Sequence, residues 1–111
     1  MMMQGYDMEA AVPFIAAKMR KDGHKLPQDE LEAFIRRAIR ADMAYMLETG
    51  VIDEEGLMGE GEYDDDDAFE ALLETLAQDE EDEDAVGAVA QLLDSYMQAQ
   101  QDFMEASGLM E

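Results

Sequence analysis

The sequence predicts an all-α protein, a small bundle of about four helices that forms one domain over residues 1–111. Strand-forming residues are scarce, since the chain holds only 4 Val, 4 Ile and 2 Thr, and no long stretch alternates apolar and polar residues. Helix-forming Ala, Leu, Met, Glu and Gln dominate, and the apolar residues recur at steps of three and four. A chain of this length has the size of one domain with a modest core.

The first helix is predicted over residues 11–22. Pro13 fits only in the opening turn of such a helix, because proline lacks the N–H that a helix interior uses. Gly23 supplies a C-terminal stop. We expect residues 1–9 to form a loosely ordered N-terminal segment. Because this helix is short, a three-helix core with a loosely docked first segment is the alternative architecture.

The second helix is predicted over residues 27–49. Pro27 has the preformed φ of a first helical position, and Gly50 ends the helix. One apolar stripe follows its length and consists of Leu31, Phe34, Ile35, Ala38, Ile39 and Met46. Asp42 is the one carboxylate on that stripe, which predicts a buried structural aspartate bonded to Tyr45 or to a backbone N–H.

The third and fourth helices are predicted over residues 66–78 and 84–107, and each follows an acidic run. The apolar stripe of the third helix consists of Phe69, Leu72, Leu73 and Leu76. The fourth helix carries the alternating three- and four-residue spacing of a packed seam, formed by Val86, Val89, Leu93, Tyr96, Gln100 and Phe103. We expect these two helices to form an antiparallel pair.

Residues 50–64 are predicted to form a glycine-rich acidic loop, because Gly56, Gly59 and Gly61 interrupt any helix there. Two apolar pairs, at 51–52 and 57–58, are expected to pin this loop to the core. The loop is therefore expected to stay close to the bundle.

The charge of the chain is divided unevenly along its length. The formal net charge is −22, from 29 acidic and 7 basic residues. Residues 1–50 hold all 7 basic residues and 8 acidic ones, which gives −1, whereas residues 51–111 hold 21 acidic residues and no basic one, which gives −21. We do not expect direct binding to nucleic acid or to an anionic membrane, because both are polyanions that would repel a negatively charged protein. Partners are expected to be basic proteins, cations or a second copy.

Several kinds of chemistry are absent from the sequence. Without cysteine, the chain has no disulfide, no thiolate metal site and no cysteine nucleophile. The only histidine, His24, lies in a predicted connection with no serine or threonine nearby as a nucleophile. We therefore assign no catalytic residue and no cofactor, and expect a protein that is not an enzyme. The longest apolar run, at 10–17, is too short to span a bilayer, so a cytoplasmic protein is expected.

The acidic runs at 64–67 and 79–84 have two interpretations. The favoured one is that carboxylates cap the helices that follow, while the remaining carboxylates are solvated. The other is weak binding of a divalent cation, for which the candidate ligands are Asp64, Asp65, Asp66 and Asp67. Residues 53–64 come closest to a twelve-residue calcium loop, but Met58 occupies the position that requires glycine, so no dedicated metal site is predicted.

A surface dense in carboxylates also predicts binding to a basic groove. Duplex DNA carries one charge per about 1.7 Å of its axis, and a rigid acidic helical scaffold can occupy the site of a nucleic-acid-binding protein in its place. In composition only, the chain resembles the small helical DNA-mimic inhibitors of phages and mobile elements. No motif carries this resemblance.

Two helices carry a second narrow apolar stripe, which predicts a second packing partner for each. On the second helix this stripe includes Ala41 and Leu47, and on the fourth it consists of Ala85, Ala88, Leu92 and Ala99. We expect these residues to contact a partner protein or to form a homodimer. The sequence therefore predicts a non-enzymatic module for protein–protein interaction or regulation. The alternatives are a nucleic-acid-mimicking inhibitor of a basic protein and a weak divalent-cation-binding domain.

Overall fold

The computed structural model describes residues 6–24, 26–54, 59–61, 64–78 and 80–108 of the chain. The described residues form four α-helices and no strand, which confirms the predicted all-α bundle. These helices are α1 (Met8–Lys21), α2 (Gln28–Thr49), α3 (Asp65–Leu76) and α4 (Glu83–Ala106). None of the helices in the described part of the chain combines the length and the apolar character that crossing a membrane requires.

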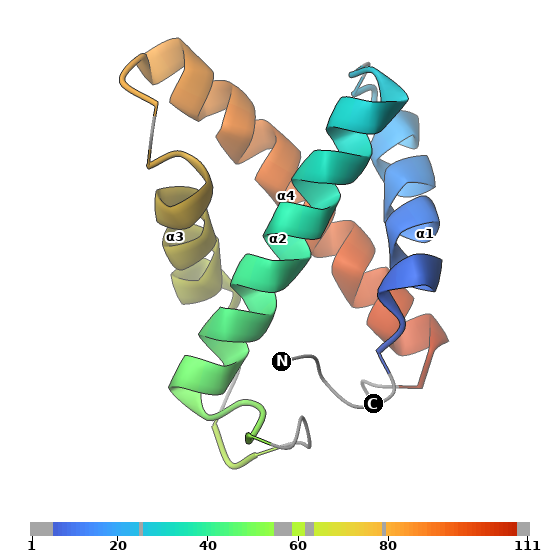
Figure 1. Cartoon of the computed structure of the whole chain (residues 1–111), viewed down its shortest axis with the longest axis vertical. Helices are drawn as coiled ribbons and strands as arrows, with labels where there is room; N and C mark the ends of the chain where they lie inside the picture. The colour runs from blue at the N-terminus through green and yellow to red at the C-terminus, as the bar shows by residue number, and fades with distance from the viewer. Residues whose placement is uncertain (1–5, 25, 55–58, 62–63, 79, 109–111) are drawn as a thin grey trace.

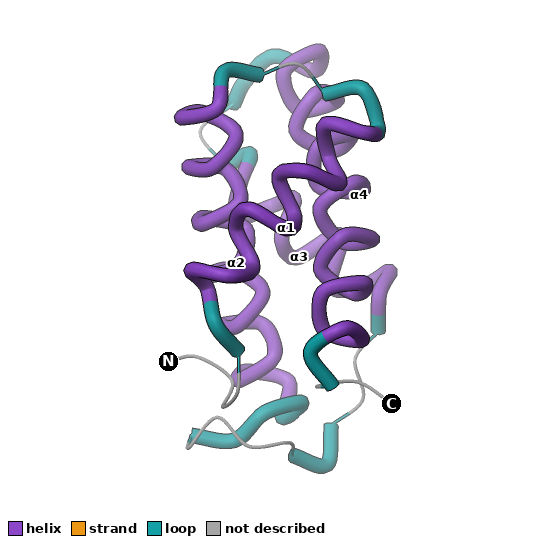
Figure 2. Tube along the Cα trace, turned by 90° about the vertical axis from the view of Figure 1, so that its right-hand side faces the viewer, coloured by secondary structure: helices purple, strands orange, loops and turns teal. Residues whose placement is uncertain are grey.

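The two long helices, α2 and α4, cross at the centre of the molecule, with α1 on one side of the crossing and α3 on the other (Figure 1). Seen along the perpendicular direction, α1 lies in front of the crossing and α3 behind it (Figure 2). Each short helix packs against both long ones, and the molecule measures 37 × 27 × 20 Å. The expected contact between α3 and α4 is therefore present, within a bundle organised around the α2–α4 crossing.

The core draws on all four helices and on the residues directly after α2. Val51 and Ile52 are buried, which confirms that the first apolar pair of the connection packs on the core, whereas the second pair lies outside the described residues. The largest fully buried side chains are mostly Ile, Leu and Met: Tyr96, Ile15, Met19, Leu31, Ile35, Ile39, Met43, Met46, Ile52, Leu72, Leu93 and Val12.

Backbone contacts fold the glycine-rich connection back onto the end of α2. Gly50 ends the helix in the left-handed conformation, with φ 82°. The backbone N–H groups of Gly59 and Gly61 donate to the carbonyls of Val51 and Gly50, at 2.8 and 2.9 Å. A Cβ atom on Gly59 would overlap the Gly50 carbonyl oxygen, so this close approach requires glycine.

Helix α1 begins at Met8, three residues before its predicted start. The Asp7 carboxylate accepts a hydrogen bond from the Glu9 backbone N–H at 3.0 Å and caps the helix. Pro13 is consequently inside the helix, and the prediction that it fits only in the opening turn is wrong. The lost hydrogen bond falls on the carbonyl of exposed Glu9, where water is available to replace it.

Part of the expected loose N-terminal segment is packed. Of residues 1–9, the structure describes 6–9, and Tyr6 is only 8% exposed. The Tyr6 hydroxyl donates to Gln100 Oε1 at 2.6 Å, and its ring meets Phe103 edge-on at 5.4 Å between centroids. Tyr6 therefore fastens the start of α1 to α4.

The other helix ends lie within one or two residues of their predicted positions. The Asp64 carboxylate accepts hydrogen bonds from the backbone N–H groups of Asp66 and Asp67, and Asp82 accepts one from that of Asp84. One carboxylate of each acidic run is therefore an N-cap, which confirms the capping interpretation for these two residues.

Removal of the α3 cap is expected to destabilise the fold. Asp64→Ala should lower the free energy of unfolding in urea by about 1 kcal/mol, because two backbone N–H groups lose their acceptor. Asp66→Ala is the matched control, since it removes the same charge from an exposed side chain that caps nothing. Equal midpoints for the two variants would contradict the capping role, and Asp64→Ser should recover most of the loss.

Candidate partner-binding surface

The described residues of the segment 51–111 present a set of exposed carboxylates. Every acidic side chain that the structure describes in this part of the chain is exposed, and the part contains no Lys or Arg. These carboxylates lie on α3, on α4 and in the connections before each helix: Asp53, Glu54, Glu60, Asp64, Asp66, Asp67, Glu70, Glu74, Glu80, Glu81, Asp82, Glu83, Asp84, Asp94, Asp102 and Glu105. Their charge is therefore directed to solvent.

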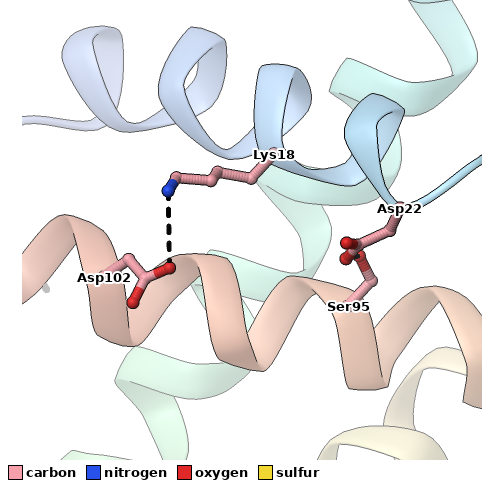
Figure 3. Close-up of polar contacts among 4 residues, drawn as sticks. All are labelled: Lys18, Asp22, Ser95 and Asp102. Atoms are coloured by element: carbon pink, nitrogen blue, oxygen red, sulfur yellow. Dashed lines mark hydrogen bonds and ion pairs between the residues drawn. The ribbon is translucent and has the colours of Figure 1, made fainter.

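The basic residues of the first half neutralise little of this charge. Among the described residues, one ion pair falls within 4.0 Å, between Lys18 Nζ and Asp102 Oδ2 at 3.6 Å (Figure 3). Arg20 instead donates to Gln28 Oε1 and to the Leu26 carbonyl, which holds the α1–α2 connection. Arg37 donates to the Leu76 carbonyl at 3.3 Å and so satisfies one of the last carbonyls of α3. Three of the cations thus fasten helices together.

The described side chains among the four weak candidates for a cation site have different environments. Asp64 caps α3, and Asp67 accepts a hydrogen bond from the Tyr45 hydroxyl at 2.7 Å. Asp66 is exposed, and the side chain of Asp65 lies outside the described part of the structure. No three acidic or histidine side chains among the described ones are placed to share a metal ion. Much of the calcium-like stretch 53–64 also lies outside the described residues.

The predicted partner-binding residues have three different environments. Ala99 is only 2% exposed and belongs to the chain's own core, whereas Ala88 is exposed. Ala85, Leu92 and Ala41 are half-buried. Leu47 is 37% exposed, the one large apolar side chain in the described part of the chain that is exposed to this degree. It lines an open depression of about 500 Å³ at the end of α2.

Two polar contacts join α1 to α4, and neither was predicted from the sequence. The Ser95 hydroxyl donates to the Asp22 carboxylate at 2.5 Å, and Lys18 pairs with Asp102 seven residues further along α4 (Figure 3). The Lys18 ammonium also lies 5.5 Å from the centroid of the Phe14 ring. The order of these pairs makes α1 and α4 antiparallel, and Asp22 marks the level at which α1 ends.

The buried polar groups serve the interior of the bundle. Asp42 is 1% exposed, as predicted, and accepts a hydrogen bond at 3.1 Å from the hydroxyl of Tyr96, a fully buried residue of α4. The predicted burial of Asp42 is therefore confirmed, and Tyr96 is a hydrogen-bond partner that the prediction, which named Tyr45 or a backbone N–H, did not include. Burial raises the pKa of Tyr6 far above its ordinary value. These contacts join α2 and the start of α1 to α4.

Tyr45 connects α2 to the acidic run in front of α3. Its side chain is 8% exposed, and burial together with the hydrogen bond to Asp67 raises the pKa of Tyr45 to about 12. The neighbouring negative charges of Asp67, Asp64 and Asp42 act in the same direction. The charged phenolate is therefore strongly disfavoured in the folded protein.

Comparison with protein-family models, with curated proteins and with solved structures finds no match to this chain.

The free energy of unfolding should fall at alkaline pH because of the raised pKa of Tyr45. The folded pKa of about 12 exceeds the ordinary value of 10.0, so between these values the folded state retains a proton that the unfolded state loses. The contribution is complete below pH 10 and is lost as pH rises toward 12. Urea midpoints measured from pH 8 to 12 should decline, and the decline should be shallower in Tyr45→Phe. An equal decline in both proteins would contradict this assignment.

Proposed function

We propose that the protein is a non-enzymatic interaction module that binds a basic protein partner through the carboxylate surface of α3 and α4. The observation that carries this proposal is the uniform exposure of the described acidic side chains in a half of the chain without a single cation. Partner cations would relieve repulsion that the chain leaves uncompensated. The absence of cysteine fits the cytoplasm as the place of action.

The carboxylates of α3 are held in place before any partner arrives. Asp66, Glu70 and Glu74 are exposed and four residues apart, so they form one row with a rise of about 6 Å between neighbours. The helix beneath them is fixed at its start by the Asp64 cap and at its end by Arg37. A row on a fixed helix loses less entropy on binding than charges on a loose tail.

A second candidate narrows the partner to a protein that binds nucleic acid. A net charge of −22 distributed over the 37 Å long axis is one negative charge per about 1.7 Å, the axial charge density of duplex DNA. The basic groove of a protein that binds duplex DNA would therefore attract this protein with comparable electrostatic strength. The distinguishing property is competition with duplex DNA for the same groove.

The proposal predicts a salt-sensitive partner. This protein is immobilised and exposed at low salt to a lysate of the source organism. It should retain a basic protein that rising NaCl releases, because salt screens exposed charges. The triple variant Asp66→Asn, Glu70→Gln, Glu74→Gln should weaken this binding about threefold or more, since each exposed pair contributes about 0.2–1 kcal/mol. Displacement of the partner by duplex DNA would select the second candidate.

The matched control for this variant removes three exposed carboxylates from α2, with Asp29→Asn, Glu30→Gln and Glu48→Gln. The control should retain the partner, because these three positions lie outside the acidic half of the chain. A partner that stays bound in 1 M NaCl and tolerates the α3 variant would overturn the proposal.

A further inference from the structure

One face of α4 is covered by α1 along only part of its length. The face consists of positions spaced alternately by three and four residues, which stack along one side of a helix: Ala85, Ala88, Leu92, Ser95 and Ala99. Ala99 and Ser95 are 2% and 5% exposed, and Ser95 bonds to Asp22 at the end of α1. Toward the start of α4, by contrast, Leu92 and Ala85 are half-buried and Ala88 is exposed.

The change in exposure coincides with the end of α1. Asp22 caps α1, and Gly23, with φ 97°, turns the chain away toward α2. The first half of α4 extends beyond this level, away from α1 (Figure 1). The side of the helix that α1 covers therefore continues for two further turns without α1.

An aspartate lies at the edge of this face of α4 at both its covered and its uncovered end. Asp102, at the covered end, pairs with Lys18 of α1 (Figure 3). Asp84 lies 18 residues earlier, which is five turns at 3.6 residues per turn, so it has the same angular position on α4. Asp84 is exposed, and within the described part of the chain it forms no ion pair. The uncovered end thus offers exposed Ala88, flanked by half-buried Ala85 and by Leu92, whose inner side packs on the chain's own core, together with an edge carboxylate.

We propose that the face formed by Ala85, Ala88 and Leu92 docks a basic amphipathic helix of the partner protein, with a Lys or Arg paired to Asp84. The inference rests on the proposed function and names the partner's recognition element. A helix fits because α1 is the helix that covers the same face further along, and because the small side chains of Ala85 and Ala88 allow close approach. A basic one fits because α4 and the connection before it carry only negative charge. That same charge opposes a second copy packing α4 against α4.

The experiment uses the full chain and a designed peptide as probe. The peptide is a fluorescein-labelled, amidated helix of about 21 residues, with Ala and Leu on one face and Lys along its edges. Binding is followed by fluorescence anisotropy in 50 mM NaCl. Ala88→Gln should weaken binding about tenfold or more, because the longer side chain separates the two helices. Asp84→Asn should weaken it about threefold to fivefold through loss of the ion pair.

Two controls carry matched changes away from this face. Asp94→Asn removes the same charge from an exposed position on another side of α4, and Ala44→Gln adds the same bulk to an exposed position on α2. Both should bind the peptide as the unmodified protein does. Circular dichroism of each variant should show unchanged helix content, which separates loss of binding from loss of folding.

Three results would overturn the docking site. If Asp84→Asn and Asp94→Asn weaken binding equally, the peptide follows overall charge, and the acidic surface survives as the proposed function without this site. If a sequence-scrambled peptide of the same composition binds as well, the partner element is not an amphipathic helix. If sedimentation shows a dimer that Ala88→Gln dissociates, the face binds a second copy. Failure of polylysine to bind in 50 mM NaCl would reject the proposed function itself.

Discussion

The absence of any basic residue after Gly50 constrains the rest of the structure. A buried carboxylate needs a cation or several hydrogen-bond donors, and the second half of the chain supplies no cation. Helices α3 and α4 turn every described carboxylate to water, and the polar side chains that α4 buries beside its apolar stripe are the uncharged Ser95 and Gln100. Among the acidic side chains that the structure describes, the buried one is Asp42, which comes from the first half and accepts a hydrogen bond from the Tyr96 hydroxyl. Charge thus determines which side of each helix faces the core.

Three of the basic side chains form polar contacts that connect one helix to another. Lys18 joins α1 to α4, Arg20 holds the α1–α2 connection, and Arg37 joins α2 to the end of α3. Each of these contacts engages a carbonyl, an amide or a single carboxylate, so most of the negative charge remains uncompensated. These cation contacts therefore hold the helices together without neutralising the negative electrostatic potential at the surface. That potential is the basis of the proposed interaction with a basic partner.

The helices were predictable because their signals are local. Apolar spacing, Pro27 and Gly50 fixed their number and placed most ends within one or two residues. Pro13 misled the prediction of the first start, because Asp7 caps the helix before Met8 and the residues just before the proline, Ala11 and Val12, are buried in the core. Contacts between distant residues, such as Ser95 with Asp22, depend on how the helices pack and leave no spacing pattern in the sequence. The second apolar stripe of α4 was visible in the sequence, but its division between the chain's own core and solvent was not.

That division follows from where α1 ends along α4. Helix α1 has 14 residues and α4 has 24, and Asp22 at the end of α1 contacts Ser95, so the residues of α4 before Ser95 extend past the end of α1. Helix α3 packs on α4 as well, but it leaves Ala88 exposed. Helices α1 and α4 diverge toward the start of α4 (Figure 1), and the chain turns away toward α2 at Gly23. Ala88 is therefore left without cover from α1, and it is here that we propose a helix of the partner packs.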